Sequence, residues 1–343
     1  MSYQPPFDIT PSIVSLVSSI SEQVGRLDSQ TLQASPQLRK QNRIQTIQST
    51  LAIEGNTLSV DQVTAILEGK RVLGQPKEIQ EVQGAIRAYQ ALPTLNPASI
   101  DDLLSAHYQL TAGLLTDAGK FRKKGVGIQK GEQVVHMAPP AKRVPHLMSD
   151  LIDWVNTTTE HALIKSCVFH YELEFIHPFM DGNGRMGRLW QTLILEQWNQ
   201  LFFLLPIESV IKDQQMSYYQ ALESADREAS STVFIEFMLG IISNALSQNS
   251  RALVQDADTS NNKATDQVTD QVKALLTVMN SQQGSEPDSE QYWSAQTLMQ
   301  KLSLAHKPTF RKNYLTPALQ IGLIVMKYPN SPRHPKQKYR TSS

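Results

Sequence analysis

The 343-residue chain contains a single cysteine, has no acidic residue after Glu290, and has no apolar run long enough to cross a membrane. A lone cysteine excludes an internal disulfide and a zinc site built from several cysteines. Because Cys167 lies in the apolar stretch LIKSCVF, we expect it to be a buried structural thiol. The N-terminal segment also lacks the basic head and the apolar core of a secretion signal. Together these absences predict a globular protein of the reducing cytoplasm that makes no membrane contact.

Charge is unevenly distributed along this chain, whose net charge is zero. Residues 291–343 hold nine basic side chains and no acidic one, so residues 1–290 carry a net charge of −9. A basic tail attached to an acidic body is typical of a segment that meets a partner of its own.

Helical periodicity dominates residues 10–250 and predicts a mainly α protein. One helix is expected at about 36–54, ending where Gly55 can adopt the left-handed cap. A later helix over 160–176 carries apolar side chains at steps of four, three and four. We expect these side chains to form one buried stripe: Ile164, Val168, Tyr171 and Phe175.

Residues 125–140, GVGIQKGEQVVHMAPP, differ from the helical sequence around them. Two short β-prone runs flank QKGE, and two prolines close the segment, so the pattern predicts a β-hairpin. An isolated hairpin has an unpaired edge, which is either a plain surface loop or a docking place for an extended peptide. The residues of such a docking edge would be Val126, Gly127, Ile128, Val134, Val135 and His136.

The end of the chain predicts a separate domain. Residues 246–266 are polar and poor in large apolar side chains, so we interpret them as a linker. Over 267–343, three helical segments precede LIVMKY, a proline-rich loop and KQKYRT. Three helices followed by a two-stranded wing is the order of a winged helix-turn-helix domain. Candidate nucleic-acid contacts there are Arg311, Lys312, Asn313 and Arg333.

The run HPFMDGNGRMGR, residues 177–188, concentrates groups that suit phosphate chemistry. Pro178 disfavours a helical conformation at His177, so the preceding helix should end there. The glycine turn that follows can lead into a new helix near residues 183–185. Backbone N–H groups at such a helix start form an anion nest, and Gly182 and Gly184 leave room for a phosphate.

Four side chains of the same run supply catalytic chemistry. Arg185 and Arg188 lie three residues apart on one helical face and can bind two phosphates. Asp181 would repel a phosphate unless a hard cation such as Mg²⁺ lay between them. His177, with an ordinary pKa of about 6.5, can take a proton at neutral pH. Together these groups are suited to the transfer of a phosphorus group to a hydroxyl.

The same run resembles the motif of the Fic family: His-Pro-Phe, any residue, an acid, Gly-Asn-Gly-Arg, two residues, Arg. Fic proteins are helical enzymes that mostly transfer AMP from ATP to a Ser, Thr or Tyr hydroxyl of a protein. The resemblance implies that His177 is the base and that Asp181 holds Mg²⁺ on the α- and β-phosphates. It also implies that Gly182, Asn183, Gly184 and Arg185 cradle the phosphates, and that Arg185 and Arg188 reach the terminal ones.

Two softer assignments follow from the resemblance. The hairpin looks like the family's flap, which pairs with a strand of an as yet unidentified target protein and presents its hydroxyl. Tyr218 and Tyr219 lie where relatives often line the adenine site, although core tyrosines would fit the pattern equally well.

A second motif predicts control of the site. The segment TLAIEG, residues 50–55, resembles the Fic inhibitory motif, in which a Ser or Thr precedes a Glu by four positions. In relatives this Glu pairs with the second arginine of the catalytic motif, here Arg188. Glu54 also opposes the dipole at its helix end, and an ion pair would relieve that conflict. We therefore expect Thr50 and Glu54 to restrain activity.

The expected architecture has a helical region over 1–95 that carries the inhibitory helix, a Fic core over 96–245, and the winged-helix tail. Removal of AMP is a second activity that stays open, and so is transfer of phosphocholine. Transfer of phosphate is disfavoured because relatives that act as kinases have a lysine where this chain has Gly184. A homodimer also stays open. The alternative from another class is a DNA-binding regulator whose Fic-like part senses a nucleotide.

Overall fold

The computed structural model describes most of the chain, in the ranges 3–27, 36–130, 133–266, 270–280, 292–304, 306–320, 322–329, 331, 334 and 336–342. It divides into two compact units, residues 1–251 and 252–343. In the described ranges, no helix is both long and apolar enough to cross a membrane.

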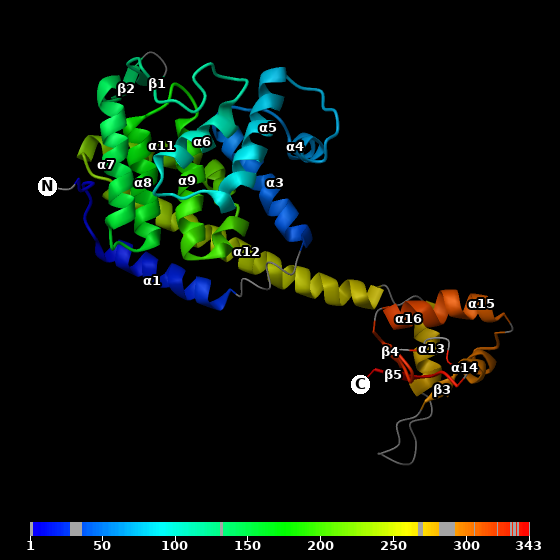
Figure 1. Cartoon of the computed structure of the whole chain (residues 1–343). Coiled ribbons are helices and arrows are strands. Elements are labelled where there is room, and N and C mark those ends of the chain that lie inside the picture. Colours follow the sequence, from blue (N-terminus) through cyan, green and yellow to red (C-terminus); the bar gives the residue numbers. More distant parts are fainter. Residues whose placement is uncertain are drawn as a thin grey trace. The chain divides into compact units, whose positions relative to one another are not determined.

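The first unit is a bundle of helices with one β-hairpin, which confirms the mainly α prediction (Figure 1). Its helices are α1 Pro11–Arg26, α3 Pro36–Ile53, α4 Val60–Leu67, α5 Pro76–Ala91, α6 Ile100–Thr111, α7 Val144–Thr157, α8 Ala162–Ile176, α9 Asn183–Trp198, α10 Ile207–Asp213, α11 Gln215–Glu228 and α12 Thr232–Asp266. The hairpin strands are β1 Gly127–Lys130 and β2 Gln133–Met137.

Helices α8 and α9 lie side by side inside the bundle and place the motif between them (Figure 1). Of the stripe predicted on α8, Ile164, Val168 and Tyr171 are buried. Phe175, however, is 37% exposed, so the prediction was wrong at this position. The reason is its location in the last turn of α8, where the side chain lines a cavity instead of the core. Cys167 is fully buried, as expected, and burial raises the pKa of its thiol to about 12.

The hairpin predicted within 125–140 is confirmed. Strands β1 and β2 pair antiparallel, with Gly127 opposite Met137 and a register irregularity after Ile128. The side chains of residues 127–137 lie outside the described part of the structure.

The segment 246–266, which its composition predicts to be a linker, is helical as the C-terminal part of α12. Polar composition suggested a linker, but residues 241–266 contain neither glycine nor proline. Without these helix breakers a polar segment can continue the preceding helix. The boundary between the two compact units falls inside this segment, after Arg251.

The second unit has the predicted order of three helical segments followed by a two-stranded wing. Its elements are α13 Asp270–Asn280, β3 Trp293–Ser294, α14 Ala295–Lys301, α15 Lys307–Phe310, a π-helical turn Arg311–Leu315, α16 Thr316–Gln320, β4 Ile324–Met326 and β5 Lys338–Thr341. The strands form one antiparallel sheet in the order β3-β5-β4. The two-residue strand β3 is too short for sequence periodicity to reveal.

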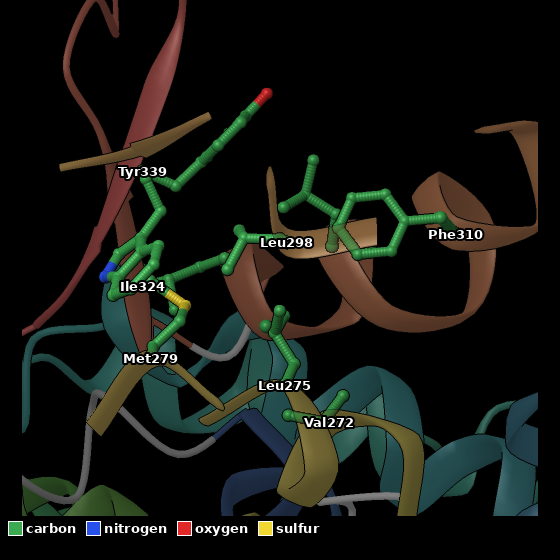
Figure 2. Packing of buried hydrophobic residues seen from close by; sticks show 10 residues of the cluster. Val272, Leu275, Met279, Leu298, Phe310, Ile324 and Tyr339 are labelled. Carbon is green, nitrogen blue, oxygen red and sulfur yellow. The ribbon is translucent and has the colours of Figure 1, made fainter. Parts of the chain in front are cut away.

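A compact apolar core holds this unit together. Helix α13 contributes three buried side chains, and α14, α15 and the strands close over them (Figure 2). The labelled members of this cluster are Val272, Leu275, Met279, Leu298, Phe310, Ile324 and Tyr339.

Candidate functional site

His177 stands at the end of α8 in a left-handed conformation. Helix α8 ends at Ile176, and His177 adopts φ 49° and ψ 61° while its N–H still donates to the Leu173 carbonyl at 2.9 Å. Pro178 favours a helix end here, because it disfavours the helical conformation of the residue before it. The Nδ1 of His177 lies 3.3 Å from the Glu174 carbonyl oxygen. A proton on Nδ1 donates to that oxygen, which makes Nε2 the basic nitrogen.

The loop after His177 is braced by a histidine on α6. Phe179 is fully buried and stacks on His107, with ring centroids 3.7 Å apart and planes 8° apart. The Gly119 N–H donates to Nδ1 of His107 at 2.9 Å, so Nε2 carries the proton and donates to the Asp181 carbonyl at 3.0 Å. Burial lowers the pKa of His107 to about 4, which keeps the ring neutral. Nothing in the local sequence marks His107 for this role.

The glycine turn and the start of α9 have the conformation that the motif predicts. Gly182 adopts φ +88°, α9 begins at Asn183, and no side chain caps its N-terminus. The Asn183 side chain is turned toward Phe179, accepting from its N–H at 2.9 Å and donating to its carbonyl at 3.0 Å. This side chain therefore braces the loop, whereas the family resemblance implied that it contacts phosphate. A side chain at Gly184 would collide with the Glu54 carboxylate.

The two arginines of the motif differ in their surroundings. Arg185 is buried, and its Nη2 lies 3.2 Å from Oδ1 of Asp181. Its Nε and Nη1 are also buried and have no hydrogen-bond partner in the described part of the chain. Arg188 lines the cavity beside His177, whereas Arg185 does not line it and its Nη2 lies near Gly182.

Arg188 is paired with the end of α3. Its Nη2 contacts Oε1 of Glu54 at 2.6 Å and also donates to the Thr50 carbonyl at 3.1 Å, while Nε donates to the Thr50 hydroxyl at 2.9 Å. The Arg188 side chain is 1% exposed and that of Glu54 is 36% exposed. Burial is the largest single effect and would lower the pKa of the guanidinium, but the charge and hydrogen bond of Glu54, together with Tyr218 and Glu174, raise that pKa above its ordinary value.

Glu174 adds a second carboxyl group to the same place, which the sequence did not reveal. Its Oε2 lies 4.0 Å from Nδ1 of His177. Its Oε1 lies 3.2 Å from the point where a Cβ at Gly184 would stand, and Oε1 of Glu54 lies closer still to that point. Burial first, and then the charge of Glu54, raise the pKa of Glu174 to about 7.

These groups line one cavity of about 460 Å³. Its wall includes polar residues of α8, α9 and the turn between them, and α11 supplies the opposite, more apolar side. Tyr218 is buried, with its hydroxyl 3.0 Å from Nε2 of His170. Tyr219 is 39% exposed and donates to the Ile53 carbonyl at 3.1 Å. Both tyrosines line the cavity, as do Glu54, Glu174, His177, Asp181, Gly182, Asn183, Gly184 and Arg188.

Arg122 connects the catalytic loop to the hairpin and was not predicted. Its side chain is buried, and Nε donates to the His177 carbonyl at 2.7 Å. Its Nη2 donates to the Pro139 carbonyl at 2.6 Å, and Nη1 donates to the Lys124 carbonyl at 2.9 Å. One guanidinium thus joins the backbone of His177 to both segments that flank the hairpin.

The remaining predicted residues do not line the cavity, or their side chains lie outside the described part of the chain. Val126 is half-buried, and the remaining hairpin side chains lie outside the described residues. In the second unit Arg311 and Lys312 are exposed and Asn313 is half-buried, while Arg333 is not described.

Asp181 can contribute one carboxylate to a metal ion. Within the described ranges, no group of three His, Cys, Asp or Glu side chains could hold a metal by itself. The Asp181 side chain is 53% exposed and its Oδ1 accepts from the Gly182 N–H at 2.6 Å. A hard cation that brings phosphate and water ligands with it fits a single carboxylate of this kind.

The raised pKa of Glu174 predicts a pH dependence of stability. The folded chain holds a proton on Glu174 up to about pH 7, whereas the unfolded chain releases it near pH 4.3. The stabilisation is therefore complete below the unfolded pKa and is lost as pH rises through the folded pKa. Urea denaturation measures the unfolding free energy at about pH 5 and at about pH 8. The fall in this free energy between the two pH values should be about 1–3 kcal/mol larger in wild type than in Glu174→Gln.

The exposed Glu228 provides the matched control for this experiment. Glu228→Gln should keep the wild-type difference between the two pH values. If Glu174→Gln kept it as well, the assignment of this pH dependence to Glu174 would be wrong.

Comparison with known proteins agrees with the motif and the fold. Residues 97–195 match the Fic/DOC family, and residues 270–342 match the family described as filamentation induced by cAMP protein Fic-like, C-terminal domain. A protein adenylyltransferase, fic-1 of Caenorhabditis briggsae, is 35% identical over 190 residues, which cover 52% of this chain and 35% of that protein. The chain thus matches about a third of the length of this curated relative.

Two solved structures extend the likeness beyond the motif. Fic-1 of Caenorhabditis elegans (residues 134–508) shares the fold with a TM-score of 0.58 and 24% identity, over 73% of this chain and 72% of that one. A Fic family protein from Desulfovibrio desulfuricans G20 is 50% identical, with a TM-score of 0.72, over 99% of both chains. Identity at this level along nearly the whole of both molecules shows that the chain belongs to the Fic family.

Proposed function

We propose that this protein transfers AMP from ATP to a hydroxyl group of a target protein. The observation that carries the proposal is the placement of a basic imidazole, His177, beside an uncapped helix start and a buried arginine, Arg188, in one cavity. The names of its relatives from Caenorhabditis, which are protein adenylyltransferases, support the same activity.

The site offers a binding place for each part of ATP. The N–H groups in the first turn of α9, which no side chain of the described residues caps, suit the phosphates. The buried Nε and Nη1 of Arg185, which have no hydrogen-bond partner among the described residues, add positive charge near Gly182. The tyrosines of α11 provide an aromatic wall for the adenine. Asp181 would hold Mg²⁺, which neutralises charge on the phosphates when it is bound.

The reaction follows from these positions. Nε2 of His177 takes the proton from the target hydroxyl, and the hydroxyl oxygen attacks the α-phosphorus. A new bond forms between that oxygen and phosphorus while the bond to the β-phosphate oxygen breaks, and pyrophosphate leaves. The N–H groups of the nest stabilise negative charge that develops on the transferred group.

The hairpin provides a place for the target. Strands β1 and β2 pair only with each other within the described residues, so an extended target segment can add to an edge by backbone hydrogen bonds. Arg122 fixes the hairpin relative to His177, and with it the distance between the presented hydroxyl and the base.

Glu54 acts as a brake in this proposal. It occupies Arg188, the cation that would otherwise bind the terminal phosphate, and its carboxylate lies over Gly184. ATP bound beside this carboxylate adopts a pose unsuited to in-line attack. A carboxylate such as Glu54 can activate a water molecule, so removal of AMP stays open as a second activity.

The activity is tested by incubating the protein with ATP, Mg²⁺ and a cell lysate. Glu54→Gly should raise the amount of AMP on the protein or on lysate proteins by about 10-fold or more, because Arg188 becomes available for phosphate. Adding His177→Ala to this variant should reduce transfer by about 100-fold or more, because the base is lost. Mass spectrometry of modified peptides measures both.

The same spectra separate the alternatives. A mass increase of phosphate or phosphocholine instead of AMP would overturn the proposed donor chemistry. Equal modification of wild type and Glu54→Gly would overturn the brake.

The role of Arg122 gives a kinetic prediction in the Glu54→Gly background. Arg122→Gln should lower kcat by about 10-fold, because His177 and the hairpin lose their common support, and should leave KM for ATP within about 2-fold. Arg122→Lys should restore part of kcat. Arg87→Gln is the matched control, since Arg87 donates to the Gln109 carbonyl away from the cavity.

A rise in KM for ATP that matched the loss in kcat would show that Arg122 only supports the fold of the loop. Unchanged kinetics would exclude the positioning role altogether.

A further inference from the structure

The last carbonyl of the inhibitory helix is held by two side chains from α11. Nε2 of Gln215 donates to the Ile53 carbonyl at 2.9 Å, and the Tyr219 hydroxyl donates to the same oxygen at 3.1 Å. Gln215 also donates to the Tyr219 hydroxyl oxygen at 3.2 Å. The two side chains lie four residues apart on one face of α11, so they act on one acceptor together.

The acceptor is placed where it determines the position of Glu54. The Ile53 carbonyl belongs to the peptide group that joins Ile53 to Glu54, so these bonds fix the backbone immediately before the inhibitory carboxylate. Carbonyls in the last turn of a helix have no partner within the helix, and here α11 supplies one. Because the Glu54 side chain is 36% exposed, surrounding side chains constrain it only in part, and its backbone must direct it.

The opposite side of the same turn is fastened to α5. Thr57 donates through its N–H and its hydroxyl to Oε1 of Glu78 at 2.6 and 2.8 Å, and Asn56 donates to Oε2 of Glu81 at 2.8 Å. The end of α3 therefore has two attachments of different kinds. The attachment to α5 is carboxylate-based and lies after Glu54. The attachment to α11 lies before Glu54 and on the side of the cavity.

We propose that Gln215 and Tyr219 form a clasp that holds Glu54 against Arg188 and so sets the strength of the brake. The proposal rests on the function proposed above, because it assigns a regulatory role within the same site. It gives Tyr219 a second task besides lining the cavity. Since Tyr219 is 39% exposed there, a group that enters the cavity and takes its hydroxyl weakens the hold on the inhibitory helix.

Tyr219→Phe and Gln215→Ala test the clasp in two backgrounds, with Glu54 and with Glu54→Gly. With Glu54 present, each variant should increase AMP transfer by about 3- to 10-fold, the effect of losing one hydrogen bond. With Glu54→Gly, Gln215→Ala should change transfer by less than about 2-fold, because no brake remains to be held and Gln215 does not line the cavity. An increase in activity cannot come from misfolding, and the phenylalanine ring keeps the aromatic wall of the cavity.

Matched controls come from the same chain. Gln220→Ala changes an exposed glutamine of α11, and Tyr108→Phe removes the hydroxyl of an exposed tyrosine on α6. Neither should alter transfer in either background. An equal increase with and without Glu54 would overturn the clasp and assign Tyr219 and Gln215 to catalysis. No increase with Glu54 present would overturn it too.

A second measurement does not depend on transfer. Hydrogen exchange of the peptide covering residues 51–57 in the full chain should be faster in Tyr219→Phe and Gln215→Ala than in wild type, by about 3- to 10-fold. Unchanged exchange would overturn the clasp whatever the activity. If Glu54→Gly showed no transfer while exchange rose as expected, the proposed function would fail and the clasp would stand as a structural device.

Discussion

The ion pair between Arg188 and Glu54 is the interaction on which the rest of the site depends. Burying a guanidinium whose side chain is 1% exposed is costly unless an anion pairs with it, because the charge is removed from water. In this structure Glu54 supplies the negative charge, while Thr50 accepts two further hydrogen bonds. A phosphate group is the chemical equivalent of that carboxylate. Under the proposed function, a phosphate of ATP and the carboxylate of Glu54 compete for Arg188.

Other side chains of the site hold the loop between α8 and α9, and the hairpin, in place. His107 and Asn183 brace the loop between α8 and α9 through its backbone, and Arg122 joins His177 to the hairpin. All three are buried, so their bonds are made in surroundings where hydrogen bonds are strong. The end of α3 is held by α11 through its helix-terminal carbonyl.

Local patterns predicted the elements and the motif, but not the contacts between distant segments. The end of α8 at His177 and the left-handed Gly55 follow from the steric properties of proline and glycine, which act within a few residues. His107, Arg122 and Glu174 carry no such local signal, because their roles come from tertiary packing. The helical conformation of 246–266 was missed because polarity was given more weight than the absence of helix breakers.

The central claim, that Glu54 takes the place of a terminal phosphate at Arg188, is tested most directly by calorimetric titration of wild type and Glu54→Gln with ATP and with AMP. This substitution keeps the volume of the side chain and removes its charge. The affinity for ATP should rise by about 5-fold or more, while the affinity for AMP, which lacks the terminal phosphates, should change by less than about 2-fold. An equal change for both nucleotides, or no change for ATP, would contradict the account.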